Sequence, residues 1–129
     1  MKEINVRVLC MAKVLITDDS LFMRTSLRTM LESAGYETCE AANGIEMLRV
    51  YEEEQPDVVT LDITMPEMDG REALRQLRAK HPQARVIMCT AMGQKTMVLD
   101  AIRDGALNFL VKPFEKSNVL DSISKALNV

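Results

Sequence analysis

Short apolar runs alternate along the chain with longer segments in which apolar residues recur every three or four positions. Most of the short runs are rich in Val, Ile and Leu, as strands buried on both faces of a sheet are, whereas the longer segments are typical of helices with one buried face. The pattern therefore predicts a strand followed by a helix, repeated five times. The predicted strands are Val14–Thr17, Tyr36–Ala41, Val58–Leu61, Arg85–Cys89 and Leu107–Val111.

Helix-ending residues follow four of the periodic segments. Gly35 and Gly105 can adopt the left-handed conformation that closes a helix, and Pro56 and Pro82 cannot continue one. Between these boundaries, each helix is expected to bury one stripe of apolar side chains. The expected stripes are Met23, Leu27, Met30 and Leu31; Leu48 and Tyr51; Leu74 and Leu77; Met97, Val98, Ala101 and Ile102; and Val119, Leu120, Ile123 and Leu127.

Strand–helix alternation predicts one α/β domain with a doubly wound, five-stranded parallel sheet. Parallel strands need crossover connections, and these are right-handed, so helices cover both faces of the sheet. Among such folds the flavodoxin-like order 2-1-3-4-5 is common and places the topological switch point between strands 1 and 3. The 129 residues suffice for a single domain over 13–129, with 1–12 as a loosely ordered N-terminal extension.

Composition narrows the function classes. A formal net charge of −3 gives no general attraction to nucleic acid, and no apolar run is long enough to span a bilayer, so we expect a soluble protein without nucleic acid as partner. The three cysteines are odd in number and lack CxxC spacing. They are expected to be free thiols in a reducing compartment, which indicates a cytoplasmic protein.

Polar residues follow four of the predicted strands: Asp18 and Asp19, Asp62, Thr90, and Lys112. Because the carboxyl ends of parallel strands lie at one edge of the sheet, these side chains should converge. Two carboxylates about 4 Å apart repel by roughly 4 kcal/mol at an effective dielectric constant of about 20, so a cation is needed among them. Carboxylate oxygens are the ligands that Mg²⁺ or Mn²⁺ prefers.

Each of these residues also has a purely structural interpretation. Asp18 or Asp19 could cap the following helix, Thr90 could be an ordinary strand residue, and Lys112 could be a surface charge. The ordered set at four strand ends favours a metal and phosphoryl site instead. There an aspartate can attack phosphorus and form an acyl phosphate, while a hydroxyl and an ammonium bind the phosphoryl oxygens.

The polar strand-end residues lie in four short segments: Thr17–Ser20, Leu61–Gly70, Thr90–Gly93 and Val111–Phe114. Together these segments resemble the receiver domains of two-component response regulators. The resemblance covers residues 13–129 and is strongest for the stand-alone chemotaxis regulators of the CheY type from Gram-positive bacteria and Thermotoga.

The resemblance implies that a histidine kinase phosphorylates Asp62. It implies that Mg²⁺ is held by Asp19, Asp62 and the Thr64 backbone carbonyl, with Asp18 acting mainly through water. Thr90 and Lys112 would bind the phosphoryl group, and the Lys112–Pro113 bond can be cis in this family.

Phe109 occupies the position of the family's switch aromatic residue, and Thr90 moving toward the phosphoryl group would vacate space for its ring. The surface of the fourth helix, fifth strand and fifth helix would then change for a downstream partner. That partner would be a flagellar switch protein or a phosphotransfer protein, and the chain itself is expected to be a monomer. The candidate partner contacts are Met92, Gln94, Lys95 and Phe114.

Other roles stay open from the sequence alone. Within the receiver family, the chain could be a phosphorelay intermediate or a phosphate sink. A haloacid-dehalogenase-type phosphatase would have a second aspartate two residues after Asp62, where Thr64 stands. A flavodoxin-like cofactor binder would need phosphate-binding amides in its first loop, where Asp18 and Asp19 would repel a phosphate.

Overall fold

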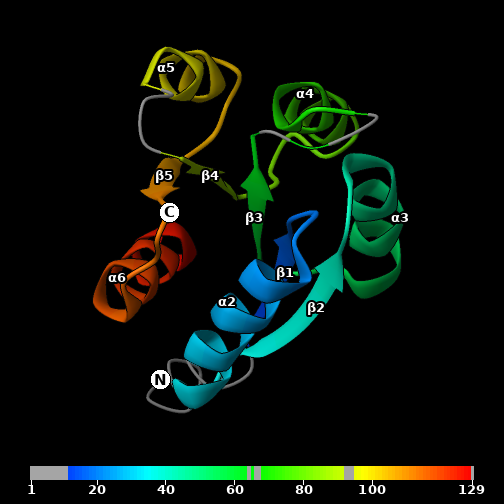
Figure 1. Ribbon diagram of the computed structural model, residues 1–129. Coiled ribbons are helices and arrows are strands. Elements are labelled where there is room, and N and C mark those ends of the chain that lie inside the picture. Colours follow the sequence, from blue (N-terminus) through cyan, green and yellow to red (C-terminus); the bar gives the residue numbers. More distant parts are fainter. Residues whose placement is uncertain (1–11, 64, 66–67, 92–94, 129) are drawn as a thin grey trace.

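The computed structural model describes residues 12–63, 65, 68–91 and 95–128. Its sheet has five parallel strands in the order β2-β1-β3-β4-β5, which confirms the predicted topology (Figure 1). The strands are β1 (Lys13–Thr17), β2 (Glu37–Ala41), β3 (Val58–Asp62), β4 (Val86–Thr90) and β5 (Asn108–Val111).

Helices α2 and α6 lie on one side of the sheet, and α3, α4 and α5 lie on the other (Figure 1). Side-chain oxygens cap three of them: Ser20, Asn43 and Asp69 each accept the backbone N–H of the residue three positions later. The helices are α2 (Leu21–Ser33), α3 (Gly44–Glu54), α4 (Gly70–Lys80), α5 (Lys95–Arg103) and α6 (Lys116–Leu127).

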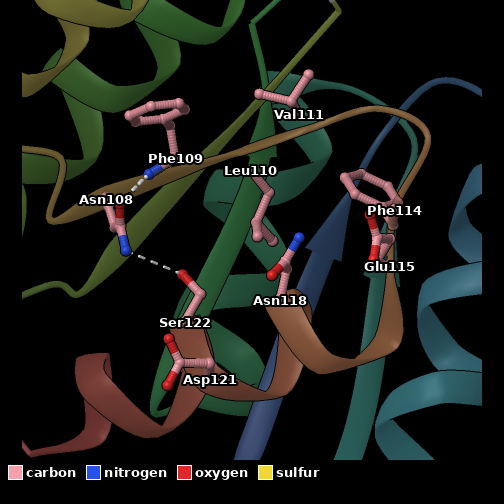
Figure 2. A pocket seen from close by; sticks show the side chains of 9 residues that line it. All are labelled: Asn108, Phe109, Leu110, Val111, Phe114, Glu115, Asn118, Asp121 and Ser122. Atoms are coloured by element: carbon pink, nitrogen blue, oxygen red, sulfur yellow. Dashed lines mark hydrogen bonds between the residues drawn. The ribbon is translucent and has the colours of Figure 1, made fainter.

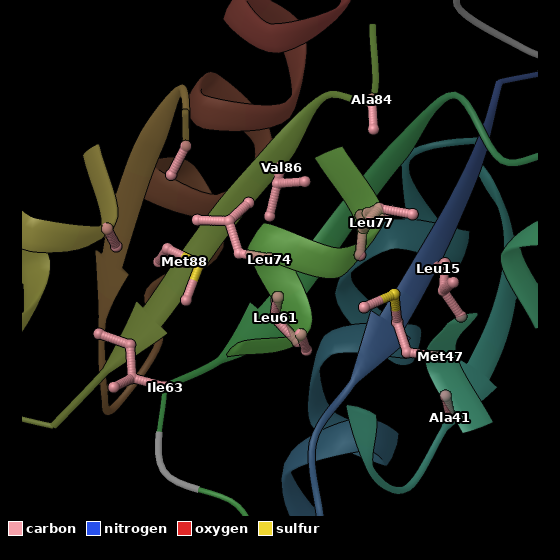
Figure 3. Packing of buried hydrophobic residues seen from close by; sticks show 14 of the residues in the cluster. Leu15, Ala41, Met47, Leu61, Ile63, Leu74, Leu77, Ala84, Val86 and Met88 are labelled. Atoms are coloured by element: carbon pink, nitrogen blue, oxygen red, sulfur yellow. The ribbon is translucent and has the colours of Figure 1, made fainter. Parts of the chain in front are cut away.

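The two faces of the sheet carry separate hydrophobic cores. Side chains along β1 and β3 alternate between the two cores. Leu15 and Leu61 face α3 and α4, while Ile16 and Val58 face α2 and α6. Figure 3 shows the first core, in which Leu74 of α4 packs among strand residues. Burial on both faces explains the continuous apolar runs of the central strands.

Some details of the sequence prediction were wrong. β4 begins at Val86 and not at Arg85, and β5 begins at Asn108 and not at Leu107. Tyr36 is not in a strand, because its backbone N–H bonds back to the carbonyl of Leu31 and so belongs to the turn that ends α2. Ile102 is exposed on α5, whereas its neighbour Ala101 is fully buried.

The remaining helix stripes agree with the prediction in part. In α3 the buried face centres on Met47 and Val50, and Leu48 and Tyr51 pack at its margin. In α2, α4 and α6 the buried residues include predicted positions: Leu27 and Leu31, Leu74 and Leu77, and Val119 and Ile123. The side chains of Met97 and Val98 lie outside the description.

The predicted N-terminal extension lies almost entirely outside the described residues. Ala12 is buried, and its carbonyl accepts the backbone N–H of Glu37 at 2.9 Å, so the last residue of the predicted extension packs beside β2. None of the described helices is both long and apolar enough to cross a membrane.

Candidate functional site

The register of the strands brings the predicted polar residues together. Thr17 pairs with Leu61, so the next residue of each strand, Asp18 and Asp62, lie side by side at the edge of the sheet. Asp62 pairs with Cys89, which places Thr90 one residue beyond it, and Thr90 in turn pairs with Val111. The residue after Val111 is Lys112, so all four strand ends meet as expected.

Three carboxylates form a group at this edge. Asp18, Asp19 and Asp62 each offer one carboxylate oxygen, and these oxygens lie within 4.8 Å of one another. Asp18 and Asp62 are buried, whereas Asp19 is exposed. A cluster of hard oxygen donors with one side open to solvent fits a divalent cation such as Mg²⁺, which retains several water ligands.

Lys112 partly balances the buried negative charge. Its Nζ lies 2.9 Å from Asp18 Oδ2 and 3.2 Å from Asp62 Oδ2. Burial lowers the pKa of Lys112, but the hydrogen bond to Asp18 and the charges of Asp62 and Asp18 outweigh this effect, so its pKa is raised above 10.5. The ammonium therefore stays charged at neutral pH. The Lys112–Pro113 peptide bond is cis.

Near this edge, the side chains of Thr90 and Phe109 lie on the face of the sheet that α3, α4 and α5 cover. Strand residues alternate between faces, so Thr90 lies on the side of Met88 and α5, and Phe109 lies opposite Leu110, which packs toward α6. Thr90 is buried, and its hydroxyl donates to the Ala91 carbonyl at 3.1 Å. Phe109 is 40% exposed, and its role as the switch residue stays a prediction.

The backbone of Asp62 and Ile63 lies tightly against the first residue of α4. The backbone N–H of Gly70 donates to the Ile63 carbonyl at 2.7 Å. A Cβ at Gly70 would collide with the Asp62 carbonyl and would lie 2.7 Å from Ile63 Cα. The sequence assigned Gly70 only to the start of a helix; its contact with the backbone of Asp62 depends on how the turn folds back.

Arg24 is a second residue near the site that the sequence did not single out for a role. Its Nη1 donates to the Asp18 carbonyl at 2.7 Å, and its Nε donates to Glu40 Oε1 at 3.0 Å. Glu40 lies on β2, which is adjacent to β1 in the sheet but distant in the chain. No local pattern in the sequence predicts such a contact.

Some predicted site residues cannot be placed. Thr64, Met92 and Gln94 lie outside the described residues, so the metal-ligand role of the first and the partner-contact role of the others stay predictions. Lys95 begins α5, but its side chain is likewise outside the description. Phe114 is half-buried and packs against the core beneath α2 and α6.

An open groove of about 260 Å³ lies between β5 and α6. Figure 2 shows the rings of Phe109 and Phe114 at opposite ends of this β5–α6 groove. Asn108 ties its floor to α6, because its Nδ2 donates to Ser122 Oγ at 3.3 Å. The groove is therefore lined both by the exposed Phe109 of β5 and by Phe114, one of the predicted partner contacts.

Comparison with known proteins identifies the family. Residues 14–124 match the model of the response regulator receiver domain. The chain belongs to the response regulator receiver family. It is therefore a signalling domain of a two-component system rather than a catalytic enzyme, and the phosphatase and cofactor-binder alternatives are excluded.

Several relatives align over nearly their whole length. The chain is 55% identical over 117 residues to the chemotaxis protein CheY of Listeria monocytogenes, an alignment that covers 90% of this chain and 98% of that protein. It is 50% identical to CheY of Bacillus subtilis, with the same coverage.

Solved structures confirm the fold. CheY from Borrelia burgdorferi, in a complex described as CheX-CheY-BeF3-Mg+2, matches with 38% identity and a TM-score of 0.84, covering 88% of this chain and 87% of that one. The response regulator domain of Thermotoga maritima CheB matches with 33% identity and a TM-score of 0.84, covering 92% of this chain and 98% of that one.

Proposed function

We propose that this receiver domain accepts a phosphoryl group on Asp62 from a phosphohistidine of a histidine kinase. A carboxylate oxygen of Asp62 attacks phosphorus, an O–P bond forms, the N–P bond breaks, and the imidazole leaves. The observation that carries the proposal is the contact of Lys112 Nζ with both Asp18 and Asp62, inside a group of three carboxylates at one sheet edge. Hydrolysis of the acyl phosphate by water would return the domain to its resting state.

The residues around Asp62 have distinct roles in this proposal. Asp18, Asp19 and Asp62, together with the Thr64 carbonyl, would hold Mg²⁺, which neutralises phosphoryl oxygens in the transition state. Lys112 is already at the site and can move from the Asp62 carboxylate to a phosphoryl oxygen. Thr90 would exchange its hydrogen bond to Ala91 for one to the phosphoryl group.

Movement of Thr90 would convert phosphorylation into a change of surface. Its inward shift frees space on the α5 side of β4, and the half-exposed ring of Phe109 on the neighbouring strand can rotate into it. The α5, β5 and α6 surface, including the β5–α6 groove, then differs between the two states. A partner is recruited only as far as it binds these states unequally.

The relatives named as chemotaxis proteins support an output in chemotaxis, with a flagellar switch protein as the downstream partner and the cytoplasm as the location. A pull-down that compares beryllofluoride-treated with untreated protein tests this. Preferential capture of a flagellar component supports the chemotaxis role. Capture of a histidine phosphotransfer protein indicates a phosphorelay, and capture of the kinase alone indicates a phosphate sink.

The phosphoryl acceptor itself is tested by mass spectrometry after incubation with acetyl phosphate and Mg²⁺. The unmodified protein should gain the mass of one phosphoryl group, and Asp62→Asn should not. Asp57→Asn is the matched control, because Asp57 lies at the opposite end of β3 and accepts the backbone N–H of Lys13. Equal phosphorylation of Asp62→Asn would overturn the proposal.

A further inference from the structure

The backbone of the acidic turn is held at Asp18 from two directions. Asp18 lies one residue beyond the paired part of β1, whose last partners are Ala41 on β2 and Leu61 on β3. Its N–H donates to the Ala41 carbonyl at 3.1 Å. Its carbonyl, which the strand ladders do not reach, accepts a hydrogen bond from Arg24 Nη1 at 2.7 Å. The Arg24 side chain therefore provides a hydrogen bond to the Asp18 carbonyl where the strand pairing has ended.

Arg24 is itself fixed in place by a second contact. Its Nε donates to Glu40 Oε1 at 3.0 Å, and the Arg24 side chain is only 15% exposed. Because the guanidinium group is planar and its donors are rigid, two hydrogen bonds in different directions determine its orientation. The other oxygen of Glu40 is bound by Arg28 Nη1 at 2.7 Å, in a more exposed contact that does not involve the Asp18 carbonyl.

The Asp18 carbonyl belongs to the peptide bond that leads into Asp19. That peptide is planar, so fixing its oxygen also fixes where the Asp19 backbone begins. Asp18 has a further constraint, because its carboxylate accepts the N–H of Ser20 and pairs with Lys112. The Asp19 carboxylate is exposed, so its position in the carboxylate group depends on the backbone rather than on packing.

We propose that Arg24 is a positioning residue for the cation site: anchored to Glu40, it orients the Asp18–Asp19 peptide so that Asp19 presents its carboxylate to Mg²⁺. This inference rests on the proposed function of the same site. Arg24 touches neither the cation nor the phosphoryl group in this account. Its charge is offset by Glu40, so it acts through the direction of its hydrogen bonds.

Titration of the full chain with Mg²⁺ in a calorimeter, at constant ionic strength, tests the proposal. Arg24→Met should bind Mg²⁺ about tenfold more weakly, as is typical when an outer-shell partner is lost. Arg28→Met is the matched control, because Arg28 binds the same Glu40 but not the Asp18 carbonyl. It should stay within about twofold of the unmodified protein, since its ion pair is half exposed.

Two more measurements separate positioning from general effects. Arg24→Lys keeps the positive charge but loses the planar guanidinium group that donates in two fixed directions. This variant should therefore recover little of the Mg²⁺ affinity that Arg24→Met loses. In the metal-free protein, the backbone amide resonance of Asp19 should shift in Arg24→Met but not in Arg28→Met. If Arg24→Met folds poorly, Glu40→Ala removes the acceptor that anchors Arg24 and should weaken Mg²⁺ binding in the same direction.

Three results would overturn the inference. They are Mg²⁺ affinity in Arg24→Met or Glu40→Ala within twofold of the unmodified protein, full recovery in Arg24→Lys, or an equal loss in Arg28→Met. These outcomes differ from failure of the proposed function, in which the unmodified protein would neither bind Mg²⁺ nor take up a phosphoryl group. If it does both, and Arg24→Met does so equally well, only the role of Arg24 is wrong.

Discussion

Lys112 shows how one residue offsets the cost of gathering like charges. Asp18 and Asp62 are buried beside each other, and the ammonium of Lys112 lies within 3.2 Å of both. The pKa of Lys112 is raised in the folded protein despite the opposing effect of burial. A raised pKa means that the contribution to stability is complete below the unfolded pKa and is lost as pH rises through the folded pKa.

Lys112→Met should therefore lower the free energy of unfolding at neutral pH in the absence of Mg²⁺. We expect a loss of about 2 kcal/mol, less than for a fully buried pair because Lys112 keeps some contact with water. Urea unfolding at neutral pH and above the ordinary lysine pKa of 10.5 measures this, and the difference between the two proteins should shrink at the higher pH.

Lys125→Met is the control for this experiment. Lys125 pairs with Asp121 on the exposed face of α6, and both side chains are mostly in solvent. Its removal should leave the urea midpoint unchanged at either pH. A Lys112→Met protein that unfolds at the same urea concentration as the unmodified protein would show that the two contacts contribute nothing.

At the scale of elements, the turn between β3 and α4 depends on the absence of a side chain at Gly70. A Cβ there would push against the Asp62 carbonyl and Ile63. Gly70→Ala should lower the free energy of unfolding by about 1–3 kcal/mol, as is usual for an inserted methyl group in a packed region. Because the displaced backbone carries Asp62, phosphorylation by acetyl phosphate should also slow.

Gly35→Ala gives a comparison with the same chemical change at a different place. Gly35 has a φ of +95° at the end of α2, with open space where a Cβ would lie. The substitution should cost stability through backbone strain, at roughly 1–2 kcal/mol, without changing the phosphorylation rate. If both variants slow phosphorylation equally, the effect follows stability and not the position of Asp62.

The pairing of β4 with β5 lies between the proposed phosphoryl site and the exposed surface of β5. Thr90 and Phe109 lie on the same face of these adjacent strands, and Phe109 is partly exposed. Phe109→Ala should leave Asp62 phosphorylation intact but reduce the gain in partner affinity. Pull-down of a downstream partner with and without beryllofluoride measures this gain. If the full gain persists, the switch assignment is wrong.

For the whole molecule, repulsion among the three carboxylates of the proposed site should lower the free energy of unfolding, and bound Mg²⁺ should offset this loss. Asp19 adds a third negative charge to Asp18 and Asp62. Asp19→Asn should therefore stabilise the metal-free protein, by roughly 1 kcal/mol for a charge this exposed. The unmodified protein should gain about 2.7 kcal/mol when Mg²⁺ is present at about one hundred times its dissociation constant.

Thermal unfolding with and without Mg²⁺ checks both parts of this prediction. Asp19→Asn should unfold at a higher temperature than the unmodified protein without the cation, and its gain upon adding Mg²⁺ should be smaller. Ca²⁺-free and Mg²⁺-free buffers with constant ionic strength exclude general screening. A lower melting temperature of metal-free Asp19→Asn would contradict the idea of charge crowding.

The sequence alone determined the fold class, strand order and most strand-end residues of this protein. These depend on periodicity, on the limited set of right-handed parallel topologies, and on the rule that strand carboxyl ends share an edge. All are local patterns or general constraints. The sequence therefore assigns Asp18, Asp62, Thr90 and Lys112 to one site, and the register brings them together.

Only the tertiary structure decided which contacts hold that site in place. The contact of Arg24 with the Asp18 carbonyl, the packing of Gly70 on Asp62 and the exposure of Ile102 all depend on how turns and helices are placed in three dimensions, even though Arg24 and Asp18 are close in the chain. Hydrogen bonds and close approaches of this kind have no periodic signature. These contacts form because of how the helices pack on the twisted sheet, and no single stretch of residues predicts that packing.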